Sequence, residues 1–402
     1  MELISLHAAV FLVAAALAVA LPLPKIARRV ALLGFNLGFL WSFDPLAPVL
    51  FLGISALGLV GCRLAARGAP AGVLALLGLP FLVPLFLPKL PWFVDGESDI
   101  GNVVGARMAM FIGASYVTLR SLHTIIEARR QRRVTFGVLD YLTWNSFFPT
   151  IVAGPIERAD HFALSFERLG RPTGEDLREG AVRMFQGLVK KAVLATLALE
   201  WAKPITTFAV EPQGLGTGEA WVALYAIALY AWFDFAGYSD MAIGAARMMG
   251  IRLAENFDNP YLRTSIAEFW RGWHLSLSFW IRDYLFLPLC GKSKSKVRPH
   301  VAAIVSMTLC GAWHAPNVGW TLWGLCHGAG LSVHQGWTGW LRKRFALKKR
   351  LAGNWAVRVV AIGLTFHFVA LTWVLVSIDP GRIGPTVEYL GVLFGVGGNG
   401  GG

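Results

Sequence analysis

Charged residues are scarce in this sequence. Asp, Glu, Lys and Arg make up 15% of its 402 residues, whereas a soluble globular chain carries roughly 25%. Hydrophobic residues make up 55%, and the mean hydropathy is +0.54. This composition excludes an ordinary soluble globular protein. The spread of apolar segments along the whole chain instead indicates one continuous bundle of membrane helices.

Several chemical signatures are also missing. The sequence has no P-loop, which argues against nucleotide hydrolysis. It has no HExxH-like spacing that would propose a metal, and no GxSxG elbow that would propose a serine hydrolase. The four cysteines form no CxxC pair and lie in or beside apolar segments, so they are expected to be small buried apolar residues. They are Cys62, Cys290, Cys310 and Cys326.

Positive charge is abundant, with a net charge of +13, but it is gathered in short clusters between apolar segments. The clusters are residues 129–133, 292–298 and 342–350. This is the arrangement of cytoplasmic loops under the positive-inside rule, so nucleic acid is not an expected partner. In the simplest interpretation the clusters only set topology. The alternative is a docking surface for an acidic partner or an anionic donor.

Eight apolar segments are candidate membrane-spanning helices, because a helical span needs about 20 apolar residues. They are 5–22, 45–62, 71–91, 104–125, 183–209, 219–246, 319–340 and 354–378. The first is followed by Lys25, Arg28 and Arg29, the reverse of the charge order of a secretory signal. We therefore expect an uncleaved first helix with the N-terminus outside.

Four apolar pieces are too short, or too rich in Trp, Pro and charge, to be simple spans. They are 30–43, 136–153, 266–290 and 300–313. We expect re-entrant or interfacial helices, which are tolerated at membrane depth only if buried in protein or lining a watery cavity. In the same region Pro149, Gly154 and Pro155 predict a re-entrant turn before Glu157. The charged stretch 160–180 reads as an amphipathic surface helix with its loop.

Segment 266–290 carries the densest set of ionisable residues in apolar sequence. Arg271, His274, Ser278 and Arg282 follow i, i+3, i+7 and i+11, so one helix would place all four on one face. Such a helix could lie in the headgroup plane with arginine on lipid phosphate. Alternatively, it could form a cavity wall that holds an anionic or thioester-bearing donor.

His314 is the second candidate. It stands 16 residues after Arg298, about 24 Å of helix, so it should lie within the membrane or near its far side. Pro316 disfavours helix at residue 315, which predicts that His314 ends a helix beside broken backbone and the amide of Asn317. His327 is more simply interpreted as a hydrogen-bonded packing residue.

Asp234 and Asp240 also lie in apolar sequence. Buried pairing of Asp240 with Arg247 or Arg271 is the favoured interpretation. A proton or cation path is the alternative, which a transporter would need.

Five motifs, in the expected order over about residues 100–375, resemble the membrane-bound O-acyltransferases. They are AGPIER (153–158), DFAGYSD (234–240), NFDNPY (256–261), FWRGWHLSLS with WIRDY (269–284), and GAWH followed by WTLWGLCHG (311–328). The subgroup that they resemble is the alginate O-acetyltransferase and D-alanyl-lipoteichoic acid export proteins. One departure is Ala315, where the family often has glycine after the histidine.

The resemblance implies an all-α, polytopic membrane fold, with a ring of tilted and re-entrant helices around a central funnel. It implies transfer of an acyl group, expected to be acetyl, from a cytoplasmic thioester to a hydroxyl of an exported polysaccharide or cell-wall glycan. The donor would be acetyl-CoA or an acyl-carrier thioester, with no permanently bound cofactor. A secreted or membrane-anchored acetyltransferase partner, membrane lipid around the chain, and an inner (plasma) membrane location are expected.

In the family the histidine matching His314 is the essential one, and the one matching His274 is the second invariant histidine. By hypothesis His314 is the base, while His274 or Asn317 orients the substrate or stabilises the oxyanion. Arg271 and Arg282 would hold donor phosphates. The remaining expected substrate-binding residues are Trp270, Ser278, Asp283 and Trp313.

The expected organisation is N-terminal membrane helices over 1–100, a catalytic core over 101–378, and a short segment over 379–402 with a disordered Gly-rich end. Two rival functions remain open, a transporter or flippase for a lipid-linked glycan and a scaffold of an export complex. Neither predicts dependence on His314. No pair of matching broken helices supports an inverted-repeat transporter.

Overall fold

The computed structural model describes residues 11, 13–19, 21–83, 113–134, 136–210, 214–291 and 295–396. All regular secondary structure within these ranges is helical. The chain divides into two compact units. Unit 1 comprises residues 1–189 with 237–255, and unit 2 comprises residues 190–236 with 256–402. Helix α14 contributes its first part to unit 2 and its last part to unit 1.

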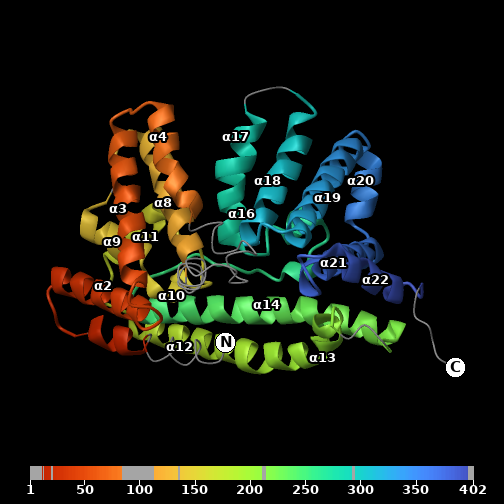
Figure 1. Ribbon diagram of the computed structural model, residues 1–402, viewed down its shortest axis with the longest axis horizontal. Coiled ribbons are helices and arrows are strands. Elements are labelled where there is room, and N and C mark those ends of the chain that lie inside the picture. Colours follow the sequence, from red (N-terminus) through yellow and green to blue (C-terminus); the bar gives the residue numbers. More distant parts are fainter. Residues whose placement is uncertain are drawn as a thin grey trace. The chain divides into compact units, whose positions relative to one another are not determined.

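Unit 1 is built mainly from helices that precede α14 (Figure 1). They are α2 (Lys25–Trp41), α3 (Ala47–Ala66), α4 (Ala71–Gly78), the 3₁₀ turn η1 (Leu79–Phe81), α8 (Ala114–Gln131), α9 (Val138–Asn145), α10 (Phe148–Ile151), α11 (Ala159–Phe166) and α12 (Gly174–Val189). Its main core joins α2, α9, α11 and the end of α14 (Thr217–Met248). Aromatic side chains such as Phe39, Tyr141 and Phe162 fill that core.

The break predicted from Pro149, Gly154 and Pro155 is confirmed, since α10 ends at Ile151 and the next helix begins only at Ala159. Helix α9 has already ended at Asn145. Arg120 of α8, only 1% exposed, forms hydrogen bonds with this broken segment. Its guanidinium donates to the carbonyls of Trp144 (3.2 Å) and Asn145 (3.1 Å) and to the hydroxyl of Thr150 (2.5 Å). A buried cation thus satisfies carbonyls that the missing helical turns leave open.

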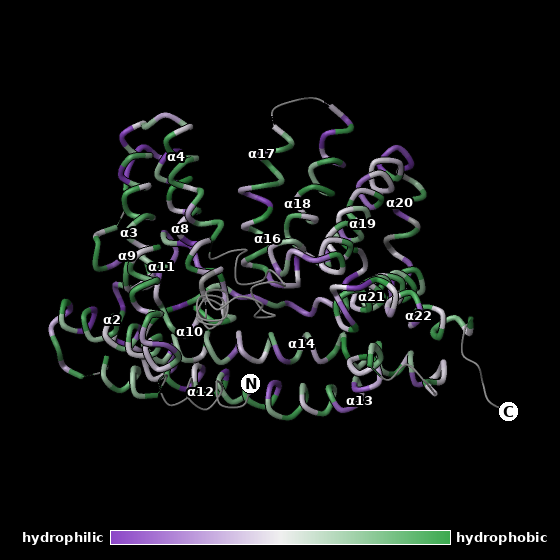
Figure 2. The backbone as a smooth tube through the Cα atoms, in the orientation of Figure 1, coloured by the Kyte–Doolittle hydropathy of each residue, from purple (hydrophilic) through white to green (hydrophobic). Residues whose placement is uncertain are grey.

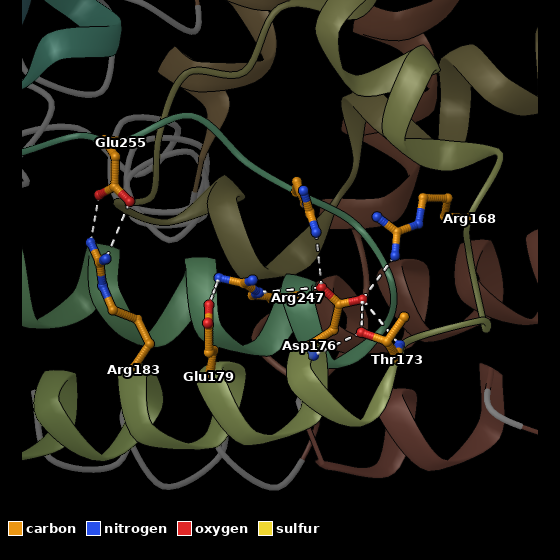
Figure 3. A network of polar contacts seen from close by, with 8 residues as sticks. Arg168, Thr173, Asp176, Glu179, Arg183, Arg247 and Glu255 are labelled. Atoms are coloured by element: carbon orange, nitrogen blue, oxygen red, sulfur yellow. Dashed lines mark hydrogen bonds and ion pairs between the residues drawn. The ribbon is translucent and has the colours of Figure 1, made fainter.

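An ionic network crosses from α12 to the end of α14 in unit 1 (Figure 3). The carboxylate of Asp176 accepts from Arg168 (2.8 Å), from Thr173 N (3.0 Å) and from the Thr173 hydroxyl (2.8 Å). It also forms ion pairs with Arg247 and Arg252, both at 3.4 Å. The stretch predicted as a surface helix over 160–180 is therefore two helices, α11 and the start of α12, joined by a loop that this network holds.

The predicted pairing of Asp240 is confirmed, and the partner that the structure shows is Arg183, which the sequence did not indicate. Arg183 of α12 donates to Asp240 at 2.7 Å and pairs with Glu255 at 2.5 Å. Arg247 instead pairs with Asp176 and Glu179. Arg183 lies 57 residues before Asp240 in the chain, so spacing along α14 alone could not find it.

Unit 2 carries the remaining helices. They are the π-helix η3 (Lys190–Ala195), α13 (Thr196–Thr207), the first part of α14, η4 (Pro260–Leu262), α15 (Ile266–Phe269), α16 (Leu275–Ile281), the π-helix η5 (Arg282–Phe286), α17 (Leu287–Cys290), α18 (Arg298–His314), α19 (Val318–Arg342), α20 (Phe345–Ala352), α21 (Trp355–Ser377) and α22 (Ile383–Leu393). Helices α18 and α19 are connected by a short break and pack against each other. Helix α19 also packs on α21. Helix α22 lies inside the short C-terminal segment expected over 379–402, and residues 397–402, which include most of its Gly-rich end, lie outside the described ranges.

Three described helices are long and apolar enough to cross a membrane. They are α3, α14 and α21. Each overlaps a predicted span, and α19 occupies the predicted span 319–340 without meeting the same apolar criterion. Apolar residues along α3 give way to hydrophilic residues at the turn between α3 and α4 (Figure 2). The predicted spans 5–22, 71–91 and 104–125 fall partly outside the described residues.

Candidate functional site

His314 ends α18, as Pro316 predicts. Ala315 leaves the helix with extended backbone (φ −157°, ψ 139°). The next helix begins after Asn317, whose side-chain oxygen accepts from the backbone N–H of Trp320 at 3.0 Å. Asn317 is therefore the N-cap of α19. The break between the two helices is short and well defined, so the position of His314 is set by two capped helix ends.

The imidazole of His314 is held between indole rings. It stacks on Trp320, with 4.6 Å between centroids and 21° between planes, and meets the edge of Trp323 at 5.8 Å. Trp313 packs edge-on at 4.7 Å. His314 is half-buried. The stacking fixes the plane of the ring, which a positioned acid–base group requires.

Direct backbone contact between α18 and α19 creates this arrangement. A Cβ atom on Gly311 would collide with the carbonyl of Trp320, and one on Gly324 would collide with the carbonyl of Met307. Small residues at such a seam let membrane helices approach closely. The close approach of the two backbones brings Trp320 and Trp323 onto His314.

His274 adopts a left-handed backbone conformation (φ 42°, ψ 56°), which non-glycine residues rarely occupy. It precedes α16, and the backbone carbonyl of Asn256 accepts from Leu275 N at 2.9 Å. The Asn256 side chain also accepts from the Ser276 hydroxyl at 2.9 Å. Asn256 of the NFDNPY motif thus fixes the turn at His274 from another part of the chain. Strained residues held by their surroundings in this way are common at functional positions.

The imidazole of His274 is 2% exposed and packs edge-on against Phe235 at 4.6 Å. Within the described residues its Nε2 atom, although buried, has no hydrogen-bond partner. His274 belongs to the same aromatic cluster as His314, since the neighbouring Trp273 packs 5.9 Å from Trp373, and Trp373 lies 6.5 Å from Trp323. A buried polar atom without a partner is costly, so it points to a ligand or water that satisfies it.

The predicted single helical face over 266–290 is wrong. Helix α15 ends at Phe269, and the chain turns before α16 begins at Leu275. Gly272 makes the turn possible, because a Cβ there would press on the carbonyl of Asp258 at 2.5 Å. The turn removes His274 from the helical face that spacing assigned to it.

Three of the four predicted residues nevertheless come together. Arg271, Ser278 and Arg282 line a cavity of about 430 Å³ with Trp270, whose other walls are mostly apolar. Arg282 pairs with Asp283 at 2.7 Å and lies over the ring of Phe279 at 4.9 Å. A mostly apolar cavity with a few cationic groups fits a ligand with a charged head and an apolar or thioester arm.

Two indole rings of unit 2 connect His314 with the cavity. His314 is not among the residues that line the cavity. Trp270, which does line it, lies 5.8 Å from Trp323, and Trp323 lies 5.8 Å from His314. The described residues therefore provide a cavity that contacts through Trp270 and Trp323 link to His314.

His327 is a packing residue, as expected. Trp270 Nε1 donates to its Nδ1 at 3.2 Å, and its Nε2 lies 3.0 Å from the hydroxyl of Thr372. That hydroxyl donates to the carbonyl of Val369 at 2.7 Å. Both ring nitrogens are hydrogen-bonded within a fully buried site, as expected for a packing residue.

Ser306 and Gln335 were missed by the sequence analysis, and both line the cavity. Ser306 is 1% exposed, and its hydroxyl has no hydrogen-bond partner in the described part of the chain. A serine in an apolar helix is weak evidence for a binding site, because its hydroxyl usually forms a hydrogen bond with the backbone of its own helix. Only the cavity distinguishes it.

Asp234 is paired rather than isolated. Lys191, in the π-helix η3, lies 2.5 Å from its carboxylate, and both side chains are largely buried. No cluster of three metal-binding side chains was found among the described residues. The acidic positions that could support a transport path are thus both engaged in ion pairs, Asp234 with Lys191 and Asp240 with Arg183.

Residues 107–375 match the model of the MBOAT, membrane-bound O-acyltransferase family. A probable alginate O-acetylase of Pseudomonas syringae is 34% identical over 356 residues, covering 83% of this chain and 64% of the relative. A teichoic acid D-alanyltransferase of Streptococcus thermophilus is 31% identical over 314 residues, covering 74% of this chain and 73% of the relative.

A peptidoglycan O-acetyltransferase of Helicobacter pylori is 34% identical over 242 residues, which are 59% of this chain and 43% of the relative. The chain spans between about two fifths and two thirds of the length of the alginate and peptidoglycan enzymes that it matches. All three kinds of relative carry names of transferases that modify a bacterial polymer.

Proposed function

Since the chain belongs to the membrane-bound O-acyltransferase family and is an integral membrane protein, we propose that it transfers an acetyl group to a hydroxyl of an exported polysaccharide or cell-wall glycan. The donor is a cytoplasmic thioester, either acetyl-CoA or an acyl carrier. The observation that carries the proposal is the histidine pair of unit 2: His314 stacked at a helix end, with the strained and buried His274 in the same aromatic cluster.

His314 acts as the general base in this proposal. Its neutral imidazole takes the proton of the acceptor hydroxyl while the hydroxyl oxygen attacks the thioester carbonyl carbon. The tetrahedral intermediate then collapses, the carbon–sulfur bond breaks, and the imidazolium returns the proton to the departing thiolate. Base catalysis by a positioned histidine contributes roughly 10²–10⁴-fold to the rate.

The stacked geometry supports this role. Trp313 and Trp320 restrict the imidazole to one plane, so little ordering remains to be done in the transition state. His274 serves as the second group at the reacting centre, with its Nε2 directed to the substrate or the oxyanion. The amide N–H of Asn317 is a further donor, since its oxygen is taken by the helix cap.

The cavity beside the pair is the proposed donor site. Arg271 and Arg282 would bind phosphates of the donor, and Ser278 and Asp283 would position its polar arm. Trp270 would pack against the thioester arm from the wall shared with Trp323. The positive charge and the apolar lining match the two ends of such a donor.

Location and partner follow from the same proposal. A multi-pass protein of the inner (plasma) membrane, with its N-terminus outside, can take a thioester from the cytoplasm and deliver the acyl group to the other side. A secreted or membrane-anchored acetyltransferase would carry the group to the polymer. The names of the relatives, with alginate, teichoic acid and peptidoglycan among their polymers, support an extracytoplasmic glycan acceptor.

The test uses membranes that contain the full chain and radiolabelled acetyl-CoA. Transfer of label to extracytoplasmic glycan is expected with the wild type and not with His314→Gln, which keeps the size of the side chain. His334→Ala removes a histidine from α19 away from the aromatic cluster and is expected to retain transfer. Equal labelling by the wild type and an equally folded His314→Gln protein would contradict the proposal.

A transporter or scaffold is the competing function. A transporter should respond more strongly to Asp234→Asn or Asp240→Asn than to His314→Gln, whereas a scaffold should tolerate all three at equal protein levels. The ion pairs made by both aspartates favour a structural role for them.

A further inference from the structure

An open groove lies between α4 and α8 in unit 1, outside the site described above. Its volume is about 610 Å³. The walls are apolar, and three arginines stand among the residues that line it. The lining residues are Ala71, Leu74, Ala75, Gly78, Leu122, Ile125, Ile126, Arg129, Arg130 and Arg132.

Helix α4 is a thin, exposed wall of this groove. It has no buried residue, and its sequence AGVLALLG contains no polar side chain. Leu76 is 68% exposed and Val73 is 41% exposed. In a membrane protein such a helix faces acyl chains, so the groove opens toward lipid.

The arginines gather at one end because α3 and α8 run parallel. A Cβ atom would meet Ser121 if added to Gly58, Ile125 if added to Gly61, and the guanidinium of Arg132 if added to Gly68. The neighbours thus advance in the same direction along both helices. Both helices therefore end together, near the turn that leads into α4 (Figure 1). Arg63 and Arg67, at the end of α3, are exposed at the same level.

The arginines that line the groove carry more positive charge than their carboxylate partners neutralise. Arg129 donates to the carbonyl of Ala69 at 2.6 Å, which is a neutral acceptor. Arg130 is offset by Glu127 at 2.9 Å. Arg132 adopts a left-handed conformation (φ 58°) at the C-cap of α8, a place where glycine is usual. No carboxylate is among the described residues that line the groove.

We propose that this groove binds an anionic phospholipid, with an acyl chain between α4 and α8 and the phosphate on Arg129 and Arg132. Basic pockets between membrane helices at a cytoplasmic surface bind anionic headgroups. Each arginine near such a surface contributes roughly fivefold in affinity. The basic cluster at 129–133 could either set the topology or form a docking surface. This proposal favours docking and names the class of ligand.

A lipid fits better than an acidic protein for a geometric reason. The arginines stand at the mouth of a lengthwise apolar groove, and a protein docked on their charges would leave the wall formed by Leu74, Ala75 and Leu122 uncovered. A phospholipid covers both parts with one molecule. The proposal is independent of the acyl-transfer reaction, because all residues that line the groove belong to unit 1.

The experiment reconstitutes the full chain in phosphatidylcholine vesicles that contain a phosphatidylglycerol with a diazirine on its acyl chain. The comparison probe is a phosphatidylcholine with the same labelled chain. After irradiation, mass spectrometry locates the cross-linked peptides. Peptides from α4 and α8 are expected to carry severalfold more label from phosphatidylglycerol than from phosphatidylcholine.

Arg132→Gln and Arg133→Gln form a matched pair, because both remove one charge from the same cluster but only Arg132 lines the groove. Labelling from phosphatidylglycerol should fall roughly fivefold in Arg132→Gln and stay unchanged in Arg133→Gln. Ala75→Phe should also reduce it by filling the groove while leaving every charge in place. Equal labelling from the two lipids, or an equal decrease in the two arginine variants, would overturn the proposal in favour of diffuse surface charge.

Discussion

Trp270 donates its indole N–H to Nδ1 of His327 across 3.2 Å. This bond leaves the ring proton of His327 on Nε2, which then donates to Thr372. The tautomer follows from the hydrogen-bond network. One side chain of the cavity wall is therefore oriented by a histidine whose own two nitrogens are both engaged.

The first prediction separates the two histidines of the GAWH and WGLCHG motifs. His327→Ala should lower the free energy of unfolding by about 3 kcal/mol, because it leaves the Trp270 N–H and the Thr372 hydroxyl buried without partners. Transfer per folded molecule should decrease less than tenfold. His314→Ala should show the reverse pattern, with a loss of roughly 10²–10⁴-fold and little loss of stability. Thermal unfolding in detergent and label transfer measured on the same preparations give both values.

The second prediction concerns the contact between α18 and α19. Gly311→Ala or Gly324→Ala places a methyl group against a backbone carbonyl, so each should cost about 2 kcal/mol of stability and also reduce transfer by displacing His314. Gly339→Ala is the matched control on α19, since nothing lies within 4 Å of a Cβ there. A Gly311→Ala protein as stable and active as Gly339→Ala would contradict the close packing of the two backbones.

The third prediction tests the left-handed backbone of His274. His274→Gly and His274→Ala both remove the imidazole, but only glycine adopts this conformation without a steric cost. The glycine variant should be more stable by about 1 kcal/mol. Both should lose transfer to the same extent if the imidazole acts at the reacting centre. An alanine variant at least as stable as the glycine variant would show that residue 274 is not strained.

The fourth prediction is a dependence of stability on pH. The backbone N–H of Thr173, aided by its hydroxyl and by Arg252 and Arg168, holds the pKa of Asp176 well below its usual value. A depressed pKa means that this carboxylate stabilises the fold above its unfolded pKa of about 3.9, and that the contribution is lost as the pH falls below that value.

Asp176→Asn should accordingly have a lower Tm than the wild type at neutral pH, and the difference should shrink as the pH approaches about 3. Glu175→Gln provides the control, since Glu175 is an exposed carboxylate in the first turn of the same helix and lies outside this network. If the wild type and Asp176→Asn lose stability in parallel down to low pH, the carboxylate is not the stabilising group.

The sequence predicted the features that depend on local rules. Pro316 predicted the end of a helix at His314, and Gly154 with Pro155 predicted the break between Ile151 and Ala159, because proline and glycine act within one turn of chain. The apolar runs around α3, α14 and α21 predicted their spans for the same reason.

Features set by distant residues could not be predicted in this way. The turn at His274 depends on Asn256 and on the carbonyl of Asp258, which press on the segment from another part of the chain. The partner of Asp240 is on α12, and the unsatisfied hydroxyl of Ser306 becomes notable only as part of a cavity wall. The predicted helical face over 266–290 required one uninterrupted helix, whereas tertiary contacts end the helix at Phe269.

The seam between Gly311 and Gly324 has a consequence for how such a protein can diversify. With no space for even a methyl group, the backbone that carries His314 cannot be adjusted by small steps of mutation. The walls formed by Ser278, Ser306 and Gln335 face an open cavity and can vary without disturbing that backbone. Enzymes with new acyl groups would therefore differ in the residues that line the cavity. The helix pair that carries His314, and with it the chemistry, would stay the same.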